Sequence, residues 1–334
     1  MRVKESQIML PAAVSQVTTS RWELSDDIAH SSEHGFEAIS VWRAKLSDSG
    51  IDRSARLISN AGMRVSSVQW AGGFTGSDGR SFNESVADAL EAILAANALA
   101  APVLIVSSGC RGGHTLTHAH RLLRQAVEAI APAASRAGVT LAIKPIHAAA
   151  AVGSSFLTNL SQALELVEQF DDSSVGLSLD LWQFGHQPDL LDLLPRLAVS
   201  AAAVQVADRI GRPSFEQERL PAGQGSLPLE ATVLALLEEG YTGPIEFDPV
   251  GEAVEEMGYE QALASTRLLA DRWASAWAEA QATALAATAR GHSYDAHGSL
   301  SRMWPDGQLQ PWQIQLRSAL PRRSHASSQI VSRG

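Results

Sequence analysis

Four polar side chains lie at the ends of apolar segments in the second half of the sequence. Lys144 ends VTLAIK, Asp180 ends SVGLSLD, Gln205 lies near the end of AAAVQV, and Asp248 follows GPIEF. An ammonium group is costly to bury unless it is paired or has a use. Carboxylates can accept and donate a proton, and a nearby cation can stabilise the anion that forms. These residue types predict acid/base chemistry if the fold brings them together.

The elements that carry these residues repeat along the chain. Apolar strand patterns alternate with helical patterns eight times, and we predict strands within 11–17, 36–42, 63–70, 101–108, 139–147, 174–182, 201–208 and 243–249. The first helix is expected to begin at a capping box formed by Ser20 and Glu23. Parallel βαβ units in this number predict an α/β fold, a closed (β/α)8 TIM barrel. An open doubly wound sheet is the alternative, but its usual glycine-rich loop is missing from VSQVTTSRWE.

In such a barrel the carboxyl ends of the strands meet at one face, so the four polar side chains should converge there. Each acid taken alone is as well explained by a helix cap or a surface ion pair. His114, His118 and His120 lie near one another in sequence, but no nearby acid or cysteine completes a set of metal ligands.

The composition limits the kind of partner. The formal net charge of −10, from 26 basic and 36 acidic residues, argues against a nucleic-acid binder and favours a small-molecule partner. There is no apolar run of transmembrane length and no signal-peptide pattern, so we expect no membrane association and a cytoplasmic location. We divide the chain into a barrel over 1–275, a helical extension over 276–291, and an irregular tail over 292–334.

One segment has a distinctive set of motifs. It runs from strand seven to strand eight and contains Gln205, Asp208, Arg219, Gly223, Gly225, Gly240-Tyr241, Gly243-Pro244 and Asp248. This pattern resembles the sugar phosphate isomerase/epimerase family, the xylose-isomerase-like TIM barrels. The resemblance covers about residues 10–275, with its most specific motifs in 139–250.

The resemblance implies a divalent metal, manganese or magnesium, held by Glu, Asp, His and Glu from strands five to eight. The corresponding residues in this chain are Lys144, Asp180, Gln205 and Asp248. A bound metal would take Asp180, Gln205 and Asp248 as ligands. The related dehydroshikimate dehydratases resemble this chain in having a glutamine at the position of Gln205. A protonated lysine cannot donate a lone pair to a metal and places a cation beside it. We therefore expect no tightly bound metal.

The resemblance implies an isomerase, epimerase or lyase that moves a proton next to the carbonyl of a sugar-like substrate. Lys144 would stabilise the anion or, as a free amine, act as a base or form a Schiff base. Asp180 and Asp248 would be the acid/base pair, and the expected substrate-binding residues are Gln205, Arg219, His186, His147, Trp70 and Trp182. One alternative is a metal-dependent dehydratase of the dehydroshikimate dehydratase type. The other is a non-catalytic binding or regulatory barrel, for which a closed mouth is expected. The residues do not decide whether the protein forms a homo-oligomer.

Overall fold

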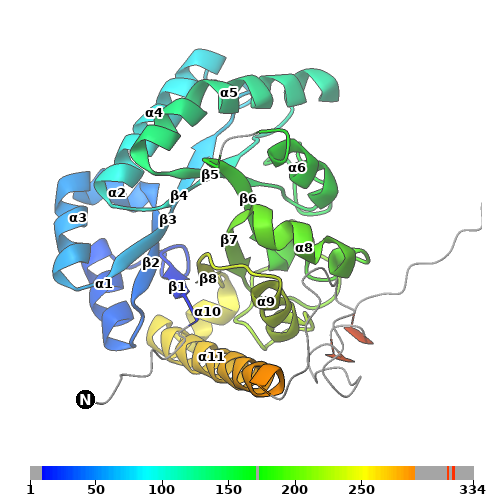
Figure 1. Cartoon of the computed structure of the whole chain (residues 1–334). Helices are drawn as coiled ribbons and strands as arrows, with labels where there is room; N and C mark the ends of the chain where they lie inside the picture. Colours follow the sequence, from blue (N-terminus) through cyan, green and yellow to red (C-terminus); the bar gives the residue numbers. More distant parts are fainter. Residues whose placement is uncertain (1–9, 171–172, 290–313, 316–317, 320–334) are drawn as a thin grey trace, which may run out of the picture.

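Eight parallel strands form a closed barrel in chain order (Figure 1). The computed structural model describes residues 10–170, 173–289, 314–315 and 318–319. The strands are β1 (Ala12–Ser15), β2 (Ala38–Trp42), β3 (Arg64–Gly72), β4 (Val103–Ser107), β5 (Thr140–Lys144), β6 (Val175–Asp180), β7 (Ala201–Val206) and β8 (Ile245–Phe247). The predicted (β/α)8 TIM barrel is confirmed.

Helices surround the barrel as an outer layer. They are α1 (Leu24–Glu33), α2 (Arg43–Ser49), α3 (Ile51–Asn60), α4 (Phe82–Ala98), α5 (Leu116–Ala137), α6 (Leu160–Val167), α8 (Leu190–Ser200), α9 (Leu229–Glu238) and α11 (Tyr259–Ala289). Two short helices, α7 (Leu181–Phe184) and α10 (Glu252–Met257), follow β6 and β8. Among the described residues, no helix is both long and apolar enough to cross a membrane.

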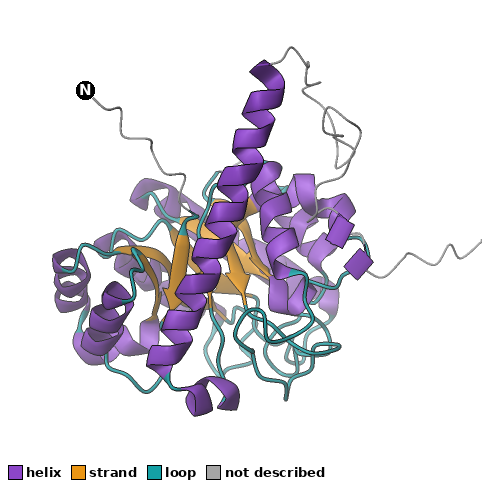
Figure 2. Ribbon diagram, turned by 90° about the horizontal axis from the view of Figure 1, so that it is seen from below, coloured by secondary structure: helices purple, strands orange, loops and turns teal. Residues whose placement is uncertain are grey.

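The predicted helical extension is the second half of α11, which runs unbroken through 276–289 (Figure 2). Figure 2 shows this half extending beyond the neighbouring helices. The predicted tail, 292–334, lies outside the described residues except for 314–315 and 318–319.

The predicted start of the first helix is wrong. Glu23, not Ser20, is the N-cap of α1, and the Asp26 carboxylate accepts the backbone N–H of Glu23 at 3.4 Å. The preceding turn is held by tertiary contacts, because the buried carboxylate of Asp27 accepts hydrogen bonds from the Thr19 hydroxyl and the Lys45 ammonium. The capping box is therefore formed by Glu23 and Asp26, three residues after the predicted pair of Ser20 and Glu23.

The barrel interior is lined mostly by short side chains. Its apolar part consists of Val103, Ile105, Ala142 and Ala203, whereas the larger apolar residues pack between the strands and the helices. Short interior side chains leave room at the mouth for long polar side chains from the later strands. The register pairs Asp180 with Gln205 across β6 and β7, which places their side chains at one level.

Candidate active site

Two cations and two carboxylates form a continuous network at the mouth of the barrel. The Lys144 ammonium nitrogen lies 3.0 Å from Oδ2 of Asp180 and donates to Oε1 of Gln205 at 2.5 Å. The Arg219 guanidinium donates to both oxygens of Asp180 at 3.0 and 3.1 Å. It also donates to Oδ1 of Asp248 at 2.5 Å. The structure therefore brings together five of the predicted residues, and Arg219 bridges the two acids.

Strand ends position three of the four charged side chains, and a loop positions the fourth. Lys144 and Asp180 end β5 and β6, and Asp248 directly follows β8. Arg219 lies in the long loop between β7 and α9, where its backbone pairs with Val250 through hydrogen bonds of 2.9 and 2.8 Å. This backbone pairing lets the guanidinium reach the carboxylates from the side of β8.

Asp208 organises the loop that carries Arg219. Its carboxylate accepts backbone N–H groups of Arg209, Gly223 and Leu227 at 2.8 to 3.1 Å. Gly225 lies against this carboxylate, and a Cβ atom there would be 2.3 Å from Oδ1 of Asp208. Gly225 is therefore required by this close approach, whereas Gly223 is required by its positive φ of 88°.

The two acids of the network differ in proton affinity. Asp180 has no exposed surface, Asp248 is 6% exposed and Lys144 is 8% exposed. Burial alone raises the pKa of Asp180, but Arg219 and Lys144 outweigh burial and hold its pKa well below the usual value. Burial, supported by the charge of Asp180, raises the pKa of Asp248 to about 6 despite the opposing effect of Arg219. Such a split assigns the permanent charge to Asp180 and the exchangeable proton to Asp248.

Trp182 forms a buried wall beside the network. The Arg219 guanidinium lies 5.4 Å from the centre of its ring, and the indole N–H donates to the Glu218 carbonyl at 3.1 Å. Its own carbonyl accepts a hydrogen bond from Arg209 at 2.6 Å. Arg209 is only 2% exposed, and it was not among the predicted site residues. Its place directly after Asp208 at the end of strand seven was the available signal.

The remaining predicted residues lie around this centre. The backbone N–H of His147 donates to Gln183, and a ring nitrogen of His186 lies 3.0 Å from the Ser226 carbonyl oxygen. Burial, together with the charge of Arg209, lowers the pKa of both histidines. Trp70 is 39% exposed. Within the described part of the chain, no hydrogen bond or ion pair joins these three residues to Lys144 or to either acid of the network.

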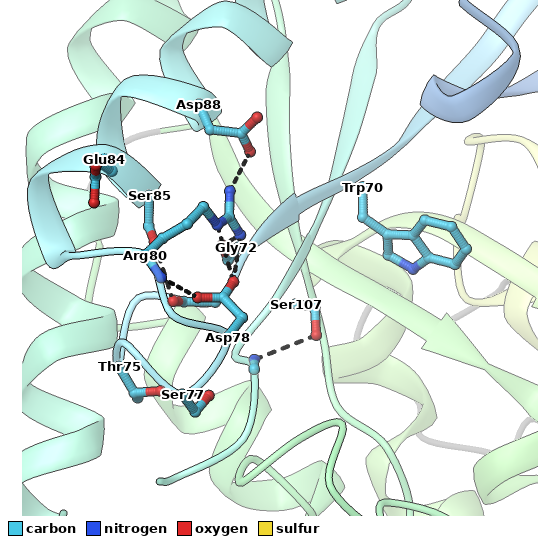
Figure 3. A network of polar contacts seen from close by, with 12 residues as sticks. Trp70, Gly72, Thr75, Ser77, Asp78, Arg80, Glu84, Ser85, Asp88 and Ser107 are labelled. Atoms are coloured by element: carbon cyan, nitrogen blue, oxygen red, sulfur yellow. Dashed lines mark hydrogen bonds and ion pairs between the residues drawn. The ribbon is translucent and has the colours of Figure 1, made fainter. Parts of the chain in front are cut away.

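A cavity of about 480 Å³ lies beside the mouth, between the ends of β3 and β4 and the helices α2 and α4. Its lining includes Trp70, Ser107 and Arg80, and Ser107 is paired with Lys144 in the β4–β5 register. Arg80 holds the loop after β3 in place, because it pairs with Asp78 and Asp88 and donates to the Gly72 carbonyl (Figure 3). This cavity therefore has a fixed rim, and its lining includes none of the five residues of the charged network.

A larger cavity lies at the opposite end of the barrel. It measures about 1130 Å³ and is lined by residues at strand starts, such as Ala12, Ala38 and Arg64. In TIM barrels this face contributes mainly to stability, and the chemistry takes place at the carboxyl ends of the strands. Volume alone is therefore a poor guide to the functional site in this protein.

Two neighbouring residues on β7 and β8, Gln205 and Glu246, each have a buried polar atom without a hydrogen-bond partner. Glu246 accepts a hydrogen bond from the Ser66 hydroxyl at 2.7 Å through Oε1, but Oε2 is unpartnered. The side-chain nitrogen of Gln205, its neighbour in the β7–β8 register, is also unpartnered. Burial raises the pKa of Glu246, which favours the neutral acid.

The residues at the mouth do not fit a divalent cation. Both carboxylate oxygens of Asp180, Oε1 of Gln205 and Oδ1 of Asp248 already accept hydrogen bonds from the Lys144 ammonium or the Arg219 guanidinium. Magnesium or manganese prefers oxygen ligands, and here it would stand beside two positive charges. Among the described residues, no group of three or more His, Cys, Asp or Glu side chains is arranged to hold a metal ion.

Comparisons with known proteins agree with this fold. The family model for the xylose isomerase-like TIM barrel matches residues 28–269. No curated protein matches the sequence significantly.

Similar solved structures share the barrel at low sequence identity. One is a protein from Sinorhizobium meliloti 1021, with a TM-score of 0.71, 21% identity, and coverage of 77% of this chain and 96% of that chain. Another is the IolI protein with a bound zinc atom (TM-score 0.70, 17% identity, 80% and 99% covered). A third is the 3-keto-D-glucoside 4-epimerase YcjR from E. coli (TM-score 0.64, 14% identity, 78% and 99% covered).

Proposed function

The chain belongs to the xylose isomerase-like TIM barrel family, and on that basis we propose that it is an isomerase or epimerase acting on a sugar-like substrate. The reaction moves a proton on the carbon next to a carbonyl group. The observation that carries this proposal is the convergence of an ammonium, a guanidinium and two carboxylates at the carboxyl ends of β5, β6 and β8. The similar E. coli protein, named as an epimerase of a keto glucoside, supports the choice of reaction class.

Each charged residue has a role that follows from its surroundings. Asp248 is the base, because its pKa of about 6 lets it lose a proton near neutral pH and take one from carbon. Lys144 stabilises the negative oxygen that forms on the substrate, since its ammonium is held at the end of β5. Asp180 stays ionised and keeps both cations in place.

Arg219 has to move for this reaction to occur. It donates to Oδ1 of Asp248 at 2.5 Å, and this oxygen cannot take a proton from carbon while the contact lasts. The hydroxyl or carbonyl oxygens of a sugar can accept the same N–H groups. Substrate binding would therefore exchange the Arg219–Asp248 pair for Arg219–substrate contacts and free the base.

A second candidate, a barrel that binds a ligand without chemistry, is favoured by one specific observation. The charged groups neutralise one another, and none of Lys144, Asp180 and Asp248 is more than 8% exposed. The metal-dependent dehydratase alternative is not favoured, because the acceptor oxygens at the mouth are already paired with cations.

Solvent hydrogen exchange separates an enzyme from a binding protein. The protein is incubated with ketohexoses and 3-keto glucosides in D₂O, and NMR follows deuterium incorporation next to the carbonyl. We expect exchange that rises as the pH increases through about 6, because Asp248 must lose its proton to act. Asp248→Asn should slow exchange by about 10²- to 10⁴-fold. Lys144→Met should slow it as well, because the oxyanion loses its cation.

The controls identify the outcome. Asp48→Asn removes an exposed carboxylate of α2 that has no part in the charged network and should leave exchange unchanged. If no sugar of the panel exchanges while one of them raises the melting temperature, the protein is a binding barrel and the proposed reaction is wrong. Borohydride treatment during exchange tests the Schiff-base version, for which a stable adduct on Lys144 is required.

A further inference from the structure

We propose that Lys144 and Arg219 together replace a divalent cation, so that the mouth of this barrel excludes metal and is held together by its own side chains. The inference goes beyond the reaction class, since it concerns the charge of the site and applies whether or not the proposed exchange occurs. Its test is a metal-binding measurement, so its failure and the failure of the proposed function can be told apart.

The charges balance as they would around a metal ion. Lys144 and Arg219 carry two positive charges, and Asp180 and Asp248 carry two negative charges when both are ionised. Arg219 bridges the two carboxylates in the way a shared cation would, with contacts of 3.0 and 2.5 Å. A guanidinium is suited to this position because its donors form a rigid fork and it stays charged.

Gln205 provides an independent observation. A lysine ammonium can only donate hydrogen bonds, so the carboxamide oxygen must face Lys144 at 2.5 Å. The amide nitrogen then points elsewhere and is left buried without a partner. Burying an unpaired donor is unfavourable, so the hydrogen bond from Lys144 to this side chain is made at the expense of the amide nitrogen, which stays unpaired. The carboxamide is thus set to accept from a resident cation.

Access by a metal would require several changes at once. A dication would have to take the oxygens of Asp180, Asp248 and Gln205 from their present donors, and Lys144 would remain beside it. Lys144 has little room to withdraw, because it is 8% exposed and lies between β4 and β6. The charge at position 144 therefore decides whether this mouth binds metal.

Reversing that charge should create a metal site. Lys144→Glu changes the charge at this position by two units. A dication carries two charges, so at about 4 Å this change amounts to four interactions between unit charges. Even at the dielectric constant of water these correspond to about a thousandfold in affinity. Adding Arg219→Gln removes the second cation, so the double variant should bind Mn²⁺ more tightly than Lys144→Glu alone.

The experiment measures bound Mn²⁺ by equilibrium dialysis and electron paramagnetic resonance on four proteins: wild type, Lys144→Glu, Lys144→Glu/Arg219→Gln, and Arg64→Glu. The last makes the same charge change at the start of β3, at the far end of the barrel. We expect no stoichiometric Mn²⁺ in the wild type or in Arg64→Glu. We expect about a thousandfold gain in Lys144→Glu and a larger one in the double variant.

Three results would overturn the inference. They are stoichiometric tight Mn²⁺ in the wild type, an equal gain in Arg64→Glu, and a folded double variant that does not bind. Circular dichroism establishes folding in each case. If Lys144→Glu does not fold, Lys144→Gln takes its place. It removes the cation without adding an anion, so its affinity for Mn²⁺ should increase by a smaller factor. A folded Lys144→Gln/Arg219→Gln protein with no increase in Mn²⁺ affinity contradicts the inference.

Discussion

Asp180→Asn should be among the most destabilising single changes at the mouth. The side chain keeps its size but loses the charge that pairs with Lys144 at 3.0 Å and with Arg219 at 3.0 and 3.1 Å. Asp180 is fully buried, so solvent cannot replace these contacts. Two cations then share Asp248 alone. Removing one partner of a buried ion pair costs about 3–5 kcal/mol, and we expect a loss in the free energy of unfolding of that size.

The loss should depend on pH in a defined direction. Arg219 and Lys144 hold the pKa of Asp180 below its usual value despite burial. A carboxyl group with a lowered pKa in the folded state stabilises the protein above the pKa of the unfolded state, about 3.9, and this stabilisation is lost as the pH falls. The difference between wild type and Asp180→Asn should therefore be full at neutral pH and shrink in acid.

Urea denaturation of the wild type, Asp180→Asn, Arg219→Gln and the double variant measures both the loss and the coupling. The double-mutant cycle should give a coupling energy of at least about 1.5 kcal/mol, because the two side chains share a bidentate ion pair. Asp48→Asn, an exposed acid, should change stability by less than about 0.5 kcal/mol. A loss below about 1 kcal/mol for Asp180→Asn, or additive single changes, would refute the buried network as described.

Two further changes test the surroundings of the network. Gly225→Ala would place Cβ 2.3 Å from Oδ1 of Asp208, so we expect the free energy of unfolding to fall by about 1–3 kcal/mol. Gly113→Ala is the control and should be nearly neutral, because a Cβ atom there has no neighbouring atom within 4 Å. Equal melting temperatures of the two variants would argue against the close approach. Glu246→Gln should leave the stability at pH 7 nearly unchanged or increase it. Burial raises the pKa of Glu246, and an acid with a raised pKa in the folded state destabilises the protein as the pH rises. Glutamine does not ionise and avoids this loss. Melting temperatures from pH 4 to 8 check this, and a loss above about 2 kcal/mol at pH 7 contradicts it.

Much of the fold could be predicted from local patterns. Alternating apolar strands and helices, repeated eight times, require parallel pairing, and eight such units close into a barrel. The same rule placed Lys144, Asp180, Gln205 and Asp248 at one face, because each lies at or directly after a strand end. The start of α1 was predicted wrongly, since a buried carboxylate network around Asp27 holds residues that locally resemble a cap.

The partners of these side chains were decided by tertiary structure. The predicted role of Arg219 in substrate binding stays a prediction, and its position between two carboxylates follows from the loop fixed by Asp208. Arg209 is buried against Trp182 through the same loop. A loop residue has no periodicity that gives its direction, so its contacts depend on where the chain returns in space. The sequence alone thus determined which charges reach the mouth of the barrel, and only the folded loop determined how they neutralise one another.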